Sequence, residues 1–211
     1  MSDRTAAESI VLHLPTGSGR LSEQAVEAVQ SGFREAVELA GPLLGLAHVD
    51  VMAIDSPDQS IPGWGCGGYT HSAYTIVLAL DPLDDGLTAE RVRATVVHEL
   101  HHIARERGPG CGTSLRERLV SEGLAMLFEE EVLGVASEFA HVTISESDID
   151  WAITRLDEDP ADDGLWFFRA DSVPLWFGYT LGYRWAKEHG ARHSVAASEL
   201  ATTEAAVIAP A

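Results

Sequence analysis

The stretch Val97-His98-Glu99-Leu100-His101-His102 lies inside a helix that the sequence predicts from about Thr88 to Arg107. His98 and His102 are four residues apart, so their imidazoles project from one face, about one turn apart, where both can reach one metal ion. Glu99 flanks this face and can touch a water there without ligating the metal. The opposite face of the helix is apolar and suited to pack on a sheet; its residues are Val96, Val97, Leu100, Ile103 and Ala104.

The sequence before this helix predicts strands mixed with one helix. Residues 74–80 are rich in β-branched and aliphatic residues and form the strongest predicted strand, and residues 10–14 and 49–54 are weaker candidates. A helix is predicted from Glu23 to Ala40, ended by Gly41-Pro42. Residues 56–68 hold two prolines and four glycines and predict a long loop.

The sequence after this helix predicts only helices. They run from Thr113 or Ser114 to Gly134, from near Ser145 or Ser147 to before Pro160, from Pro174 to Gly190, and weakly over 194–207. A few strands followed by helices predict an α+β fold, with a small β-sheet packed on the metal-binding helix and an all-helical C-terminal half. We expect a single domain over residues 1–211, with an N-terminal α/β part to about residue 107 and a helical part from about 108.

The charge of the chain argues against two classes of partner. Its 33 acidic and 14 basic residues give a formal net charge of −19, which repels phosphate backbones and anionic lipid, so we expect neither a nucleic acid nor a membrane partner. No window is apolar enough for a membrane helix, and the first nine residues lack the pattern of a signal peptide. Two cysteines are too few for a disulfide framework. We therefore expect a cytoplasmic protein.

Glu122 is the candidate for a third metal ligand. It falls on the apolar face of the next predicted helix, among Leu115, Leu119, Met126 and Leu133. A buried carboxylate needs a cation, which a metal ion held by two histidines would supply. The alternative is a salt bridge to Arg116 or Arg118 of its own helix. Two histidines and one glutamate would leave a tetrahedral zinc one open position, which is typical of catalytic sites.

The motif His98-Glu99-Leu100-His101-His102, followed 19 residues later by Glu122 in Ser121-Glu122-Gly123-Leu124-Ala125, resembles the gluzincin branch of zinc metallopeptidases. More narrowly, residues 50–190 resemble the YjaZ-like family of predicted Zn-dependent proteases. Softer matches are Ile61 to Thr70, the strand Thr75 to Leu80 with Asp81-Pro82, and Gly178-Tyr179-x-x-Gly182-Tyr183. The resemblance implies a zincin-like fold, a Zn²⁺ cofactor, and His98, His102 and Glu122 as the zinc ligands.

The resemblance also implies a hydrolase that cleaves peptide bonds with a water activated by zinc, with Glu99 as general base. It matches the strand 74–80 to the zincin edge strand, which binds an extended peptide through its main chain; the alternative is an ordinary interior strand. Tyr183 or Tyr179 is the candidate donor for the oxyanion of the transition state, with His71 and Tyr69 as alternatives. The competing interpretation is that Tyr179 and Tyr183 are half-buried residues of the core.

Two details of the site stay open. His101, His71 or Cys111 could close it as a fourth ligand, although His101, three residues after His98, points to the other side. Some gluzincins place an aspartate four residues after the glutamate ligand, but Met126 stands there, and Glu129 is the possible substitute. The leading function is a peptidase acting on peptides or unfolded protein. The competing functions are a zinc protein that binds peptides or partners with little cleavage, and a purely structural metal site. The sequence predicts no particular oligomeric state.

Overall fold

The computed structural model describes residues 9–210 of the chain. The residues on which the expectation of no signal peptide rests lie mostly outside this range. The chain divides into two compact units, Met1–Ala104 and Arg105–Ala211, close to the boundary expected between the α/β and helical parts. Their union in a single domain stays a prediction. Among the described residues, no helix is both long and apolar enough to cross a membrane.

The first unit contains a four-stranded mixed sheet. The strands are β1 (Ile10–His13), β2 (Val49–Asp55), β3 (Cys66–Ser72) and β4 (Thr75–Leu80), in the order β1-β2-β4-β3. β1, β2 and β4 are parallel, and β3 pairs antiparallel with β4 through a tight hairpin, with an irregularity between Thr70 and Ser72. The α+β fold expected from the sequence is confirmed.

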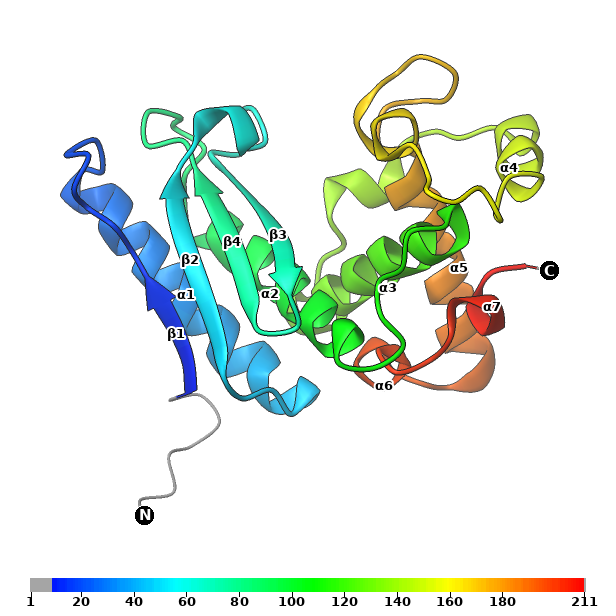
Figure 1. The fold of residues 1–211 in the computed structure, drawn as a ribbon, viewed down its shortest axis with the longest axis horizontal. Helices are drawn as coiled ribbons and strands as arrows, with labels where there is room; N and C mark the ends of the chain where they lie inside the picture. The colour runs from blue at the N-terminus through cyan, green and yellow to red at the C-terminus, as the bar shows by residue number, and fades with distance from the viewer. Residues whose placement is uncertain (1–8, 211) are drawn as a thin grey trace. The chain divides into compact units, whose positions relative to one another are not determined.

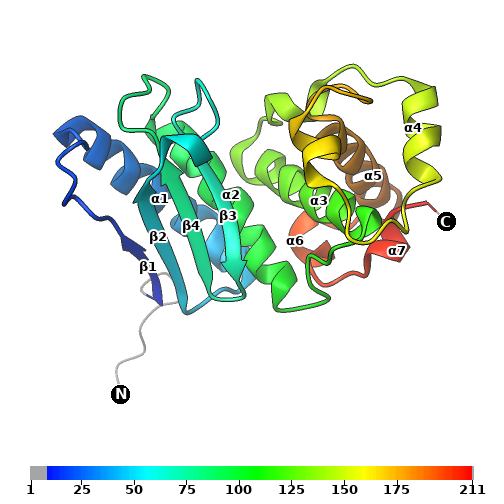
Figure 2. The same ribbon diagram turned by 45° about the horizontal axis from the view of Figure 1, so that its top comes forward.

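Helices α1 (Glu23–Leu44) and α2 (Ala89–Glu106) cover one face of this sheet (Figures 1 and 2). The two helices approach closely, because a β-carbon on Gly32 of α1 would lie 2.4 Å from the carbonyl oxygen of Ala89. The predicted apolar face of α2 is fully buried at Val96, Val97, Leu100 and Ile103, as are Val51, Ile76 and Leu78 of the sheet. α2 therefore packs as its sequence pattern predicts.

Two predictions about the strands are wrong. The expected loop over 56–68 extends only to Gly65, and Cys66–Ser72 forms a strand that the glycine content concealed. The strand 74–80 was expected at the edge of the sheet, but β4 lies between β2 and β3. Its almost wholly apolar sequence fits this interior position, and β1 and β3 are the two edge strands.

The second unit is helical: the described residues after Arg105 form no strand. Its main helices are α3 (Leu115–Leu133), α4 (Glu146–Ile153) and α5 (Phe177–His193), followed by the short α6 (Ala197–Leu200) and α7 (Ala205–Ile208). A buried cluster from α3, α4, α5 and the segment between α4 and α5 forms its core; it includes Leu119, Trp166, Phe177 and Leu181.

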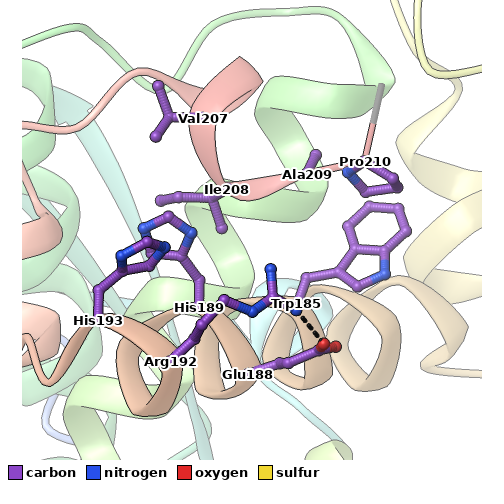
Figure 3. Close-up of a pocket in the computed structure, with 9 residues that line it drawn as sticks. All are labelled: Trp185, Glu188, His189, Arg192, His193, Val207, Ile208, Ala209 and Pro210. Atoms are coloured by element: carbon purple, nitrogen blue, oxygen red, sulfur yellow. Dashed lines mark hydrogen bonds and ion pairs between the residues drawn. The ribbon is translucent and has the colours of Figure 1, made fainter.

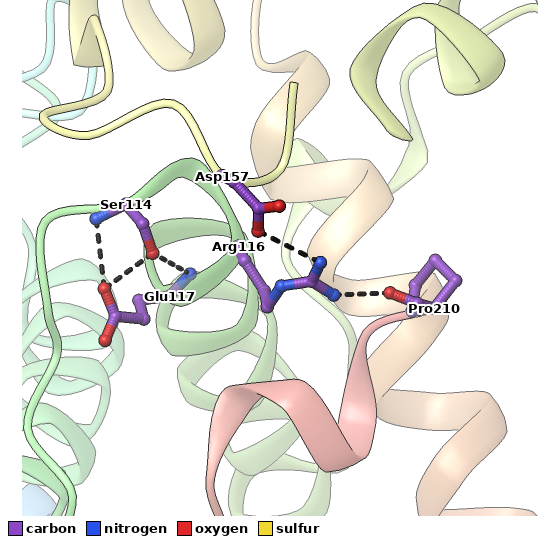
Figure 4. A network of polar contacts seen from close by, with 5 residues as sticks. All are labelled: Ser114, Arg116, Glu117, Asp157 and Pro210. Carbon is purple, nitrogen blue, oxygen red and sulfur yellow. Dashed lines mark hydrogen bonds and ion pairs between the residues drawn. The ribbon is translucent and has the colours of Figure 1, made fainter. Parts of the chain in front are cut away.

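Polar contacts fix the start of α3 (Figure 4). Ser114 and Glu117 form a reciprocal capping box, in which the Glu117 carboxylate accepts from the Ser114 backbone N–H at 3.0 Å. Arg116 donates to the carbonyl oxygen of Pro210 and, at 3.3 Å, to Asp157. These bonds tie the first turn of α3 to the C-terminal segment and to the chain after α4.

Several helix ends differ from the sequence prediction. α1 continues past Pro42 to Leu44, because a proline in the last turn removes only one hydrogen bond, and Gly45 with φ +60° then ends the helix. α5 begins at Phe177 rather than Pro174. Trp176, immediately before it, has φ +65°, which a helical residue cannot adopt.

Candidate metal centre

His98 and His102 lie one turn apart on α2, and the turn of the helix brings their imidazoles together. Their Nε2 atoms are 3.0 Å apart, and the ring centroids are 4.7 Å apart at an angle of 73°. Potential ligand atoms of His98, Glu99 and His102 all lie within 4.8 Å of one another. His102 and Glu99 are buried, whereas His98 is half-buried. The spacing that the sequence indicated therefore yields a compact group of two nitrogen donors and one carboxylate.

This donor set fits zinc. Two nitrogens that are each about 2.0–2.1 Å from a tetrahedral zinc lie roughly 3.3 Å apart, close to the 3.0 Å between the two Nε2 atoms. Imidazole is also a ligand type that zinc takes in catalytic sites. The separation of the two nitrogens is therefore compatible with one zinc ion bound by both rings.

The carboxylate of Glu99 is held from the edge strand β3. Thr70 Oγ1 lies 2.9 Å from Glu99 Oε2 and 3.2 Å from the Glu99 carbonyl oxygen, and the hydroxyl can donate to either. Alternate residues of a strand share a face, so Gly68 faces α2 as well. A β-carbon on Gly68 would lie 2.8 Å from Glu99 Cγ and 2.8 Å from Thr95 Cγ2. Glu99 therefore fills the space that a side chain at residue 68 would need.

Sequence reasoning missed Thr70 and Gly68 as site residues. Gly68 was assigned to the predicted loop over residues 56–68. Thr70 entered only as the last residue of the segment Ile61 to Thr70 that resembles the family. Their contact with Glu99 joins residues about 30 positions apart in the chain and depends on the hairpin of β3 and β4. The one available signal was the pair Gly67-Gly68 beside β-forming residues, which is typical of a close backbone approach.

The other candidates on these elements lie in different surroundings. Tyr69 and His71 of β3 are exposed, with ring centroids 6.5 Å apart. His101 is fully buried. Cys66 is also buried, and burial raises the pKa of its thiol to about 11, although a hydrogen bond with Thr95 opposes this rise. Burial thus favours the neutral thiol form of Cys66.

Glu122, the expected third ligand, lies on α3 in the second unit and is buried. Its neighbour Arg118 donates two hydrogen bonds to Asp163, at 3.0 and 2.9 Å. Burial lowers the pKa of Arg118, but the negative charge of Glu122 and the bonds to Asp163 outweigh it, so this pKa is raised. Both Glu122 as zinc ligand and Glu122 as partner of Arg118 stay predictions.

Tyr183, the first candidate for the oxyanion donor, is buried on α5. Its hydroxyl donates to Glu130 Oε2 at 2.6 Å and accepts from Lys187 Nζ at 2.7 Å, and Lys187 also contacts both oxygens of Glu130 at 2.9 Å. Burial and the bond to Glu130 raise the pKa of Tyr183. Since its single proton lies in the bond to Glu130, Tyr183 must release Glu130 before it can donate to a substrate.

Tyr179, one turn earlier on α5, lies in a group of aromatic rings. Its ring centroid is 5.1 Å from that of Phe167, 5.8 Å from that of Trp176 and 6.2 Å from that of Phe139. Its ring is half-buried, as the competing interpretation supposed. The catalytic role of either tyrosine stays a prediction.

Comparison with known proteins identifies a family for this chain. Residues 49–209 match the model of a family described as "Predicted Zn-dependent protease (DUF2268)", which covers the sheet from β2 onward, α2, and the helical unit. No curated protein and no solved structure matches the chain.

Proposed function

We propose that this chain, which belongs to the family of predicted Zn-dependent proteases, is a zinc metallopeptidase of the gluzincin type. The observation that carries the proposal is the arrangement on α2: His98 and His102 bring two nitrogen donors to 3.0 Å, and Glu99 lies beside them. Glu122 is proposed as the third protein ligand. A closed structural zinc site needs no carboxylate positioned beside its ligands, so this arrangement favours catalysis over a structural role.

When bound, zinc would supply Lewis-acid chemistry, activating a water and polarising the scissile carbonyl. Glu99 would accept the proton of that water on its carboxylate and pass it to the leaving amine. The hydrogen bond from Thr70 orients this carboxylate and stabilises its charged form. The close contact with Gly68 restricts the movement of the side chain. The protein thus presents a base whose position is fixed before the substrate arrives.

The substrate would bind in an extended form along β3. This strand is at the edge of the sheet, next to β4 on one side only, so its other side can pair with a peptide main chain. Gly68 and Thr70 face Glu99 from the same strand, so a peptide bound there would pass close to the base. We propose peptides or unfolded protein as substrates, and the net charge of −19 favours neutral or basic ones.

A second candidate is a zinc protein that binds peptides with little cleavage. It is favoured by Tyr183, whose proton is engaged by Glu130, because without a donor for the oxyanion hydrolysis would be slow. Peptide binding without turnover by the zinc-loaded wild type would select this candidate.

The test compares wild type with Glu99→Gln and His98→Ala. Each purified protein is assayed for zinc content and for cleavage of a mixture of fluorogenic peptides. We expect about one zinc per chain in wild type and in Glu99→Gln, cleavage only in wild type, and loss of most zinc in His98→Ala. Unchanged cleavage by Glu99→Gln would refute the mechanism. Loss of zinc from Glu99→Gln would instead make Glu99 a ligand.

A further inference from the structure

The end of α5 carries a second pair of histidines at the same spacing as the pair on α2. His189 and His193 are four residues apart and line a pocket of about 280 Å³ in the second unit. Figure 3 shows both rings directed toward Ile208 of α7, above the last turns of α5. The pocket is built only from α5 and the C-terminal residues 207–210. It belongs to one compact unit and is separate in sequence from the candidate metal centre.

The two rings are close and their nitrogens are available. The ring centroids are 4.5 Å apart with the planes inclined at 38°, comparable to the 4.7 Å between the rings of His98 and His102. Within residues 9–210, neither the His189 side chain nor the His193 side chain makes a hydrogen bond or an ion pair. The ring nitrogens of both residues are therefore not engaged by other side chains of the fold.

The charges around the pair allow a cation. Arg192 lines the same pocket, but it forms an ion pair with Glu188, one turn earlier. His193 is the last residue of α5, and the C-terminal end of a helix carries partial negative charge. The carbonyl ends of α5 thus favour a positive ion near the rings, and the neighbouring Arg192 is paired with Glu188.

We propose that His189 and His193 bind a divalent transition-metal ion, with waters in its remaining positions. Two imidazoles at i and i+4 on one helix are borderline-soft donors that suit zinc, nickel and copper, with copper bound most tightly. A site with two protein ligands binds more weakly than one with three. This site therefore fills only after the centre on α2, and the proposal does not depend on peptidase activity.

The test isolates the second site in a variant of the full chain that carries His98→Ala and His102→Ala. This variant is titrated with Cu²⁺ alone, and the bound ion is followed by electron paramagnetic resonance, in which nitrogen ligands give a characteristic splitting. We expect a copper signal with nitrogen coordination. Adding His193→Ala, at an exposed position, should abolish that signal, and His189→Ala should do the same.

The matched control is His13→Ala in the same background. His13 is also an exposed histidine, but it contacts Asp50 at 2.7 Å in the first unit, so its loss should leave the copper signal unchanged. A nitrogen-coordinated copper signal that survives both His189→Ala and His193→Ala would overturn the proposal, as would the absence of copper binding by the background variant.

Discussion

Thr70 Oγ1 on the edge strand lies 2.9 Å from Glu99 Oε2 on the metal helix, and this bond crosses from the sheet to the helix packed against it. Thr70 and Glu99 are 29 residues apart in the chain, so only the folded hairpin of β3 and β4 brings them together. The bond joins the element proposed to bind substrate to the residue proposed to move the proton. A movement of β3 would therefore change the position of the Glu99 carboxylate.

Replacing Thr70 by valine should lower kcat while leaving zinc content and KM nearly unchanged. Valine keeps the shape of threonine but cannot donate to Glu99. A hydrogen bond to a charged group contributes roughly 1.5–3 kcal/mol, so we expect kcat to fall by roughly 10- to 100-fold. Thr70→Ser retains the hydroxyl and should recover most of the rate. Equal rates for the valine and serine variants would assign Thr70 a packing role only.

Gly68→Ala should displace Glu99 or destabilise the first unit. The added β-carbon would meet two side chains of α2 at 2.8 Å, and overpacking of this kind costs typically about 1–3 kcal/mol. Thermal melting and cleavage assays should both register the change. Gly17→Ala is the matched control, because nothing lies within 4 Å of its β-carbon position. A Gly68→Ala protein with wild-type stability and activity would contradict the close packing at this position.

Glu122→Gln separates a zinc ligand from a partner of Arg118. If Glu122 binds zinc, the neutral amide should weaken zinc binding strongly. The glutamine variant should then melt no lower than wild type in chelator, since burying an amide costs less than burying a charge. With saturating zinc, wild type should melt higher, because the ion stabilises only the protein that binds it. An equal loss of stability with and without zinc would assign Glu122 to Arg118.

Tyr183→Phe and Tyr179→Phe test the oxyanion donor. If Tyr183 serves the transition state, its loss should reduce kcat by about 10²-fold with little change in KM. If the hydroxyl only holds Glu130, melting temperature should fall while kcat stays the same. Tyr179→Phe is the comparison on the same helix. Two variants with wild-type kcat would transfer the role to His71 or Tyr69.

Acid should weaken the contacts of Glu130. Burial raises the pKa of this carboxyl, but the hydrogen bonds from Tyr183 and Lys187 outweigh it and bring the pKa below its ordinary value of about 4.5. Because the folded state favours the charged form, the stabilisation is present above about pH 4.5 and is lost as pH falls through the folded pKa. Melting across this range should show a smaller loss in Glu130→Gln than in wild type. Glu138→Gln, at an exposed residue, should behave as wild type.

The sequence predicted the metal helix well because its information is local. The apolar face of α2 and the positions of His98 and His102 follow from a period of 3.6 residues, and the caps of α3 at Ser114 and Gly134 follow from residue type. The edge strand was missed because Gly68 is favoured there by the side chains of Thr95 and Glu99, which no local pattern reports. The start of α5 was missed for a similar reason. Trp176 has φ +65°, and a tryptophan in the sequence does not predict this left-handed backbone conformation.

The crossing of α3 and α5 has a consequence for how this protein can vary. A β-carbon on Gly123 would lie 2.1 Å from the carbonyl carbon of Gly182, and one on Gly182 would lie 2.0 Å from the carbonyl oxygen of Leu119. The two backbones are in contact at these positions. A residue with a β-carbon therefore does not fit at either position unless the two helices move apart. Gly123 is adjacent to Glu122, and the crossing therefore fixes the rotation of α3 about its own axis at the residue proposed to bind zinc. Natural variants of this chain should change its surface charges freely while this pair of glycines stays the same.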